Sequence, residues 1–560
     1  MILQILTLFG ALGLLLYGMG ILTAGAQKST GPLLRRYPDL MARSTAKQVA
    51  FGIGYTSLLQ SSSATTIIAV GFVNAGMLTL VQSIGVIMGA NIGTTVTAWL
   101  FTIFGFHLEA TWFTFPILLA GFLMTMFKNP KIKNIGEYVL GFAIMFIGLF
   151  FLRSAFPADS PALDGLFDKL SGFGFWSVLI YFIISILLTV CLQSSAVTMA
   201  FTLMLTYSGL ISFEMAAAMV LGENLGTTLT ANIAARKADV QARRAALTHI
   251  LFNLIGVVIV LACFPLCLKG VKALIDLFPI ANPALADLYA IALFHTLFNL
   301  LTTLLLLPFR EKLAALVVRM IAEPEKKDEP FRLRHISTWR IASPAIAIEQ
   351  TYREVLDFAQ AAFDGFQYVK RMLTVTDADK FELYRTKLIH CEEITDKYEY
   401  ELAAFLSKLS AENTSSEENQ EIKSLYRVIS ELESLGDSCE NISRLFVRLR
   451  THTKGFNEES SSKLALLIGK VNQAFVAMIT NLKAAQQGTL TSIDNAITIE
   501  QGINETRDVL REEGILQIER QSGNYQSMNY YLDMLEQLEA MGDFIINVSQ
   551  SILKVKEQDV

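Results

Sequence analysis

Two short polar clusters interrupt long apolar stretches of the sequence, and their residue types suit an oxyanion bound together with a cation. Residues 60–66 read QSSSATT, and residues 193–198 read QSSAVT. Backbone N–H groups freed at such a break, and the positive end of the helix that follows, favour an anion. Serine and threonine hydroxyls can donate to an oxyanion or lend oxygen atoms to a cation. The residues predicted to bind the anion at these clusters are Gln60, Ser61, Ser62, Ser63, Gln193, Ser194 and Ser195.

A second polar motif follows each cluster: GANIGTTVTA at 89–98 and GENLGTTLTA at 222–231. Asn91 and Asn224 are predicted to join the anion site. The alternative interpretation is structural, with threonines bonding to their own helix and glycines allowing close packing. The occurrence of the motif beside both clusters favours binding. The predicted sodium ligands are Ser62, Ser63, Thr65, Thr94, Thr95, Ser195, Thr198, Thr227, Thr228 and Glu223.

The polar clusters carry no compensating positive charge. No Lys or Arg occurs between Gln48 and Thr79, or between Phe173 and Phe213. A dianion bound there would be poorly neutralised by the protein alone, so we expect co-bound cations. Hard Na⁺ prefers hydroxyl and carbonyl oxygens, which links anion and sodium transport in one hypothesis.

Three further polar features lie in apolar segments. Glu223 stands where the first motif has Ala90, and an intramembrane carboxylate is a functional candidate as a cation ligand, a proton-coupled group or a partner for a buried donor. HxxFN strings place His249 with Asn253 and His295 with Asn299, one helical turn apart. For these histidines we expect satisfied hydrogen bonds between helices.

Both motif pairs recur at one offset of 133 residues, which indicates an internal duplication. We predict repeats at about 1–130 and 134–270, with an extra helix at 286–308. Three predicted spans separate the two copies, so the second copy is expected to be inverted, as in many secondary transporters. A duplicated structural bundle is the alternative, but it would not place the same Gln-Ser-Ser break at the centre of both copies.

The elements that must position these motifs are membrane helices. The chain has 560 residues, of which 52% are apolar. A span needs about 20 apolar residues. Two stretches, 48–78 and 173–208, are broken in the middle, each half being too short to span, and are predicted to form re-entrant hairpins. The predicted spans are 5–26, 80–106, 110–127, 135–152, 212–235, 246–268 and 286–308.

Loop charges predict the orientation in the cell membrane. Basic residues gather in 28–47, in 128–133, in 236–244 and after the last span, whereas 153–172 carries no basic excess. The positive-inside rule then gives seven crossings, an outer N-terminus and a cytoplasmic C-terminal half. The five cysteines show no framework spacing and are expected to be free thiols.

The C-terminal half, 341–560, follows a linker at 319–340 and has long amphipathic periods typical of an all-helical bundle. ELESLGDSCENI at 431–442 and EQLEAMGDFIINV at 536–548 match at an offset of 106, which predicts three-helix bundles at about 345–452 and 458–555. Carboxylates one turn apart could bind metal ions, completed by Glu392, Asp396 or Glu500; a solvated acidic stripe is the alternative. The tentative metal ligands are Glu433, Asp437, Glu539 and Asp543.

The doubled QSSS/QSSA and GANIGTT/GENLGTT motifs resemble the Na⁺/phosphate cotransporter family over about 300 residues. The resemblance implies that Gln60–Ser63 and Gln193–Ser195 carry the phosphate and sodium sites. Departures at Ala196, in place of Ser63, and at Glu223 bear on the number of cations. The C-terminal motifs resemble PhoU regulators, which implies a regulatory module and favours phosphate.

The sequence thus predicts an all-α, polytopic sodium–phosphate symporter that performs uptake. Rival hypotheses are transport of another oxyanion or a carboxylate, and a membrane-anchored phosphate sensor without flux. No nucleophile elbow, P-loop or HExxH motif is present, so an enzyme is not expected. The expected partners are phosphate, sodium and the lipid bilayer rather than nucleic acid, and oligomeric state is left open.

Overall fold

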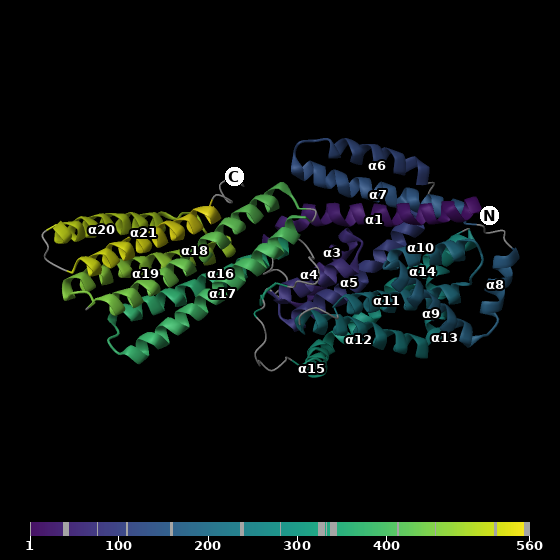
Figure 1. Cartoon of the computed structure of the whole chain (residues 1–560). Coiled ribbons are helices and arrows are strands. Elements are labelled where there is room, and N and C mark those ends of the chain that lie inside the picture. The colour runs from purple at the N-terminus through teal and green to yellow at the C-terminus, as the bar shows by residue number, and fades with distance from the viewer. Residues whose placement is uncertain are drawn as a thin grey trace. The chain divides into compact units, whose positions relative to one another are not determined.

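In the computed structural model, all regular secondary structure among the described residues is helical (Figure 1). The chain divides into two compact units, Met1–Glu325 with Ser337–Ile346, and Lys326–Ile336 with Ala347–Val560. Each unit is considered by itself. The described residues are 2–36, 44–74, 77–107, 110–156, 161–235, 240–280, 282–322, 331, 333–336, 344–411, 414–453, 455–519 and 524–553.

The N-terminal unit holds the apolar helices. Its elements are α1 (Ile2–Arg36), α3 (Thr45–Leu59), α4 (Ser62–Asn74), α5 (Leu80–Leu100), the π-helical η1 (Phe101–His107), α6 (Ala110–Thr125), α7 (Pro130–Ala155), α8 (Pro161–Ser171), α9 (Phe175–Leu192), α10 (Ser195–Tyr207), α11 (Phe213–Ala235), α12 (Val240–Ala262), α13 (Phe264–Ile275), α14 (Pro283–Leu306), the 3₁₀ turn η2 (Leu307–Phe309) and α15 (Arg310–Met320).

Length and composition give seven candidate membrane spans among the described residues. Six lie in the N-terminal unit, so the protein is a multi-pass membrane protein. The seventh, Glu458–Gln486, is a helix of the C-terminal unit. The candidates are Leu6–Thr30, Leu80–His107, Pro130–Ala155, Phe175–Leu192, Val240–Ala262, Pro283–Met320 and Glu458–Gln486.

Several predicted spans differ from the helices observed. The predicted span 246–268 is observed with shifted bounds, as the candidate span Val240–Ala262. α12 ends at Ala262, and Pro265, which has no N–H to continue a helix, lies in the first turn of α13. The predicted span 110–127 forms α6, which has only 16 residues. The predicted span 212–235 forms α11, whose polar motif lowers its mean hydropathy, and it is not among the candidates.

Two other expectations need correction. The first half of the second broken stretch is not too short, since α9 has 18 residues and qualifies as a candidate span. The basic segment predicted as a loop from residue 28 begins inside a helix, because α1 continues to Arg36. Lys28 pairs there with Glu137 of α7 at 2.7 Å, which stabilises the extension.

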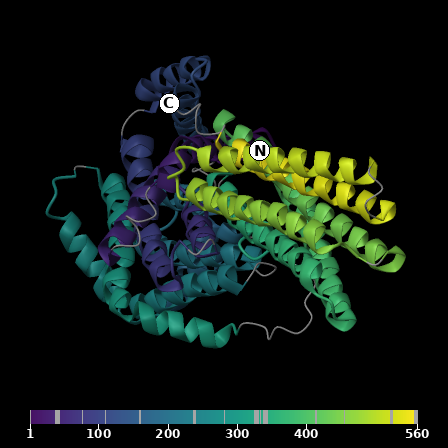
Figure 2. The ribbon, with the colours of Figure 1, turned by 90° about the vertical axis from the view of Figure 1, so that its left-hand side faces the viewer.

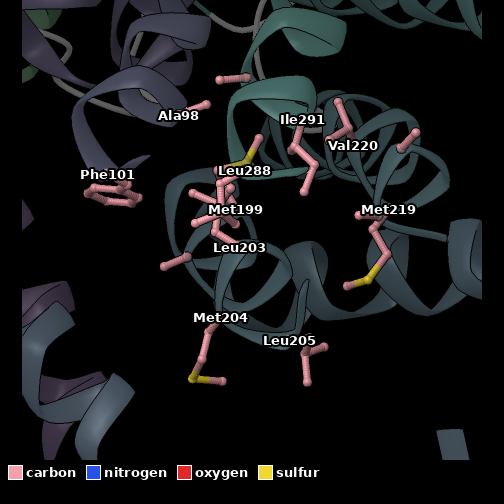
Figure 3. Packing of buried hydrophobic residues seen from close by; sticks show 14 of the residues in the cluster. Ala98, Phe101, Met199, Leu203, Met204, Leu205, Met219, Val220, Leu288 and Ile291 are labelled. Atoms are coloured by element: carbon pink, nitrogen blue, oxygen red, sulfur yellow. The ribbon is translucent and has the colours of Figure 1, made fainter. Parts of the chain in front are cut away.

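The core of the N-terminal unit is a large apolar cluster contributed by α1, α5, α7, α9–α11 and α14, among other elements. Figure 3 shows part of it, where α10 and α11 meet α14. Helix pairs that are neighbours in this unit include α1 with α7, α3 with α5, and α9 with α11.

The described residues of the C-terminal unit form six long helices, which run alongside one another (Figures 1 and 2). Three helices lie within each of the ranges predicted for a three-helix set. The two sets also pack together, because α18 contacts α21, and Phe366 of α16 stacks on Phe475 of α19. The helices are α16 (Pro344–Thr374), α17 (Ala378–Ser410), α18 (Ser416–His452), α19 (Glu458–Gln486), α20 (Asp494–Glu519) and α21 (Tyr525–Leu553).

Most of the linker predicted at 319–340 lies outside the described residues, which include only 319–322, Phe331 and 333–336 of it. His335 is bound to α16 through its backbone N–H, which donates to Glu354, and its ring Nε2 lies 3.2 Å from Asp357. The hydrogen bond to Asp357 is the main reason that the pKa of His335 is raised.

Candidate functional site

Both Gln-Ser-Ser clusters break a helix in the same way. Gln60 ends α3 with φ 52° and ψ 30°, and Gln193 ends α9 with φ 52° and ψ 27°. These are the only non-glycine residues with positive φ in the described part of the chain. A left-handed residue other than glycine is uncommon and is retained where the surroundings require it. The backbone therefore supports the prediction that these two positions are special.

The helix after each break begins with a serine cap. Ser61 Oγ accepts the N–H of Ala64, and Ser194 Oγ accepts the N–H of Val197, both at 3.3 Å. These two hydroxyls thus have a structural role in addition to any role in binding. Ser62 and Ser195 occupy the first turns of α4 and α10, where N–H groups lack helical partners.

A threonine pair joins the two helices at each break. Thr56 Oγ1 donates to Thr65 Oγ1 at 2.8 Å, and Thr189 Oγ1 donates to Thr198 Oγ1 at 3.0 Å. Sequence reasoning proposed Thr65 and Thr198 as sodium ligands but missed Thr56 and Thr189. Their recurrence at the 133-residue offset was the available signal.

Glycines of the second motif hold the following helix close to each break. A Cβ at Gly93 would lie 2.6 Å from Ile53 O and 2.8 Å from Thr56 Cβ, and a Cβ at Gly226 would lie 2.8 Å from Thr189 Cβ. α5 can therefore approach α3, and α11 can approach α9, in the same register. The close helix packing that the structural alternative expects is thus observed at both glycines.

The two copies also contact each other reciprocally. α4, which follows the first break, contacts α11 of the second copy, and α10, which follows the second break, contacts α5 of the first copy. Each serine-capped helix therefore lies against the other copy's GxNxGTT helix. The order of the chain alone did not specify this arrangement.

The side chains at the breaks differ in exposure. Gln60 is buried, and its Oε1 accepts the hydroxyl of Thr97 at 2.7 Å. Gln193 is exposed, while Thr230, the counterpart of Thr97, donates to the carbonyl of Thr227 in its own helix. The first break is thus closed by a side-chain bond that the second break lacks.

The threonines of the second motifs bond within their own helices, as the structural alternative expected. Their hydroxyls donate to carbonyls three or four residues earlier at 2.7–3.0 Å, which leaves their oxygen lone pairs free to accept. These residues are Thr94, Thr95, Thr227 and Thr228. A role in sodium binding stays a prediction.

The two asparagines of the motifs are buried but bond differently. Asn91 Oδ1 lies 2.8 Å from His249 Nε2 on α12, which is the expected bond between helices, whereas His249 Nδ1 has no partner among the described residues. Asn224 Nδ2 donates to Val220 O in its own helix. The same expectation is wrong for His295, whose ring nitrogens have no hydrogen-bond partner among the described residues. The nearest acid is Glu223, with 3.9 Å between Oε1 and Nε2.

A family model described as Na⁺/Pi-cotransporter matches residues 14–154 and 175–274, which contain both breaks and both second motifs. The N-terminal half of this chain belongs to the Na⁺/Pi-cotransporter family. Membership of a transporter family implies a non-enzymatic function.

Curated relatives extend this comparison. “Uncharacterized protein YqeW” of Bacillus subtilis is 30% identical over 296 residues, covering 52% of this chain and 90% of the relative. The relative named “Putative inorganic phosphate export protein YjbB” is 24% identical over 569 residues in both Salmonella typhimurium and Escherichia coli, covering 100% of this chain and 99% of each relative. No solved structure matches the chain.

The C-terminal half of this Na⁺/Pi-cotransporter family member contains an acidic cluster at its first motif. Carboxylate oxygens of Glu392, Asp396 and Asp437 lie within 4.8 Å of one another. Burial and the neighbouring carboxylates raise the pKa of Glu392 and of Asp396. Three convergent carboxylates fit a hard divalent cation. Glu433 lies beside the cluster. Its burial, and next the negative charges of Asp437 and Glu399, raise its pKa to about 7.

At the second C-terminal motif, an arginine compensates the charge of Glu539. Glu539 accepts from Arg507 at 3.1 Å, and Glu500 accepts from Asn504 at 2.6 Å. Asp543, the counterpart of Asp437, belongs to no group of three potential ligands in the described part of the chain. The four tentative metal ligands therefore lie in two unlike environments.

Proposed function

We propose that this protein is a sodium-coupled transporter of inorganic phosphate, with substrate sites at the two helix breaks. The observation that carries the proposal is the repeated break itself, with a left-handed glutamine followed by a serine-capped helix. Phosphate would bind at the N-termini of α4 and α10, where first-turn N–H groups and the helix dipole favour an anion. The phosphate ligands would be Gln60–Ser63, Gln193–Ser195, Asn91 and Asn224.

Sodium would neutralise the bound phosphate. Neither broken stretch contains a Lys or Arg, and the surroundings are rich in hydroxyl oxygens whose protons are already donated within the helix. The ligands would be those predicted from the sequence, Ser62, Ser63, Thr65, Thr94, Thr95, Ser195, Thr198, Thr227, Thr228 and Glu223.

The two copies would be inverted repeats whose breaks form re-entrant hairpins. Support comes from the equal backbone angles at the breaks and from the reciprocal contacts of α4 with α11 and α10 with α5. The N-terminus would lie outside and the C-terminal unit in the cytoplasm. That unit would be a PhoU-like regulator that binds a metal ion at Glu392, Asp396 and Asp437.

The test is labelled-phosphate uptake by full-length protein in liposomes, comparing an inward Na⁺ gradient with K⁺ at matched pH. We expect concentrative uptake with Na⁺ alone. Ser62→Ala and Ser195→Ala should each lower the rate about 10- to 100-fold, since a hydrogen bond to a charged group contributes about 1.5–3 kcal/mol. Ser154→Ala, which removes an exposed hydroxyl of α7, is the matched control.

Equal uptake with K⁺ would overturn sodium coupling, and better transport of sulfate or a carboxylate would overturn phosphate as the substrate. Phosphate binding without flux under any gradient would support the sensor instead.

A second candidate is phosphate export, favoured by the name of the full-length relatives. Liposomes loaded with labelled phosphate distinguish the two. Efflux that proceeds against an inward Na⁺ gradient, without uptake under that gradient, would favour export over symport.

A further inference from the structure

The contact between α11 and α14 contains an incomplete polar site. Glu223 and His295 are each only 1% exposed, and 3.9 Å separates Glu223 Oε1 from His295 Nε2, which is too long for a hydrogen bond. Residues 283–306 of α14 follow both sequence repeats. The site therefore joins the second repeat to a helix outside the duplication.

Four buried polar atoms at these residues lack a hydrogen-bond partner among the described residues. They are Glu223 Oε2, both ring nitrogens of His295, and Asn299 Oδ1, one turn further along α14. The Asn299 amide nitrogen is already used, because it donates to His295 O at 3.0 Å, so an accepting oxygen is left. Buried polar groups are nearly always satisfied, so this group points to a missing ligand.

Buried apolar residues lie one helical turn from Glu223 and from His295. Val220 lies one turn before Glu223 on α11, and Ile291 lies one turn before His295 on α14; both belong to one apolar cluster (Figure 3). An uncompensated carboxylate in such surroundings is costly. A cation would offset its charge.

The corresponding region of the first copy contrasts with this site. Ala90 stands in place of Glu223, and the neighbouring Asn91 bonds to His249 of the other HxxFN string. That histidine thus has an amide partner and no carboxylate. His249 Nδ1 and Asn253 Oδ1 also lack a partner among the described residues, so the carboxylate of Glu223 is what distinguishes the second-copy site.

We propose that Glu223, His295 and Asn299 together bind one sodium ion, so that α14 completes a cation site. The carboxylate supplies the charge, and the Asn299 oxygen and a neutral His295 nitrogen supply further ligands. A proton could satisfy one of these atoms, whereas a cation can contact several at once. The inference rests on the proposed function, because it assigns one co-transported ion.

The experiment measures ²²Na⁺ binding to purified full-length protein, without phosphate and with choline replacing Na⁺ as the osmotic control. Glu223→Gln should lower the number of bound Na⁺ by one and raise the Na⁺ concentration for half-maximal phosphate uptake about tenfold or more. Asn299→Ala should raise this half-maximal Na⁺ concentration several-fold. Glu214→Gln, an exposed acid of the same helix, is the matched control and should leave both quantities unchanged.

Wild-type Na⁺ stoichiometry and affinity in monodisperse Glu223→Gln protein would overturn the inference. If that variant does not fold, unchanged Na⁺ affinity in Asn299→Ala would do so. The binding assay does not require transport, so its failure is distinct from failure of the proposed function. Na⁺-dependent uptake with an unaltered ion count in the variants would refute this site alone.

Discussion

The two helix breaks of the N-terminal unit share a backbone and differ in their side chains. At Gln60 and Gln193 the φ and ψ angles agree within 3°, and the threonine pair recurs beside each. Yet Gln60 is buried and bonded to Thr97, whereas Gln193 is exposed. The two breaks thus share the backbone geometry proposed to bind an anion and differ in the groups around it.

The C-terminal unit repeats this behaviour with acids. Its first motif contributes Asp437 to a cluster of three carboxylates, whereas Glu539 of the second motif is paired with Arg507. In both units, therefore, one copy has a different charge or exposure from the other. Duplicated motifs specify a common scaffold, and the tertiary partners decide what each copy can bind.

The largest effect is expected where the two breaks are most alike. Gly93→Ala and Gly226→Ala each insert a Cβ within 2.8 Å of a neighbouring atom, so both should destabilise the protein by roughly 1–3 kcal/mol. Thermal unfolding of the detergent-solubilised chain measures this. Gly54→Ala, which has open space around it, is the control and should be neutral or slightly stabilising. A large effect in only one copy would mean that the shared packing is not equally important.

The side-chain difference between the breaks predicts a smaller effect. Gln60→Ala should destabilise by about 1 kcal/mol more than Gln193→Ala, because only Gln60 is buried with a bond to Thr97. The equal φ angles make backbone strain cancel between the two variants. Equal unfolding temperatures for the pair would contradict the asymmetry.

The C-terminal comparison predicts selective stabilisation by cations. Mg²⁺ or Mn²⁺ should raise the unfolding temperature of the full chain by a few degrees, since a bound ion relieves repulsion among Glu392, Asp396 and Asp437. Asp437→Asn should abolish this shift, and Asp543→Asn should preserve it. Loss of the cation-induced rise in unfolding temperature in Asp543→Asn, but not in Asp437→Asn, would place the cation at the second motif instead.

The smallest effect concerns pH. The folded-state pKa of Glu433 is raised to about 7 from an ordinary value of 4.5, so its contribution to stability is present below pH 4.5 and is lost as pH rises through about 7. The Glu433→Gln variant should therefore be more stable to unfolding than wild type at pH 8. The difference in stability between the two proteins should vanish near pH 5. Hydrogen exchange of α18 between pH 5 and pH 8 measures this. Slower hydrogen exchange of α18 in wild type than in Glu433→Gln at pH 8 would contradict this prediction.

Sequence reasoning anticipated much of the scaffold. The breaks at Gln60 and Gln193 were predicted because polar clusters interrupt apolar stretches, and the helices of the C-terminal half follow from their amphipathic period. The break between α12 and α13 and the length of α9 are not predicted by the sequence pattern. Hydropathy registers apolar content over a window, whereas Pro265 ends a helix by removing a single hydrogen-bond donor.

The sequence by itself determined the family resemblance, the repeated motifs and the residue types at each break, because these depend on residue identity and on spacing along the chain. Only the tertiary structure decided which side chains from different helices lie together: Thr97 with Gln60, His249 with Asn91, and Glu223 beside His295. These pairs come from different helices, 37 to 158 residues apart. Their proximity depends on helix packing, in which glycines set how closely the helices approach, and periodicity carries no information about that.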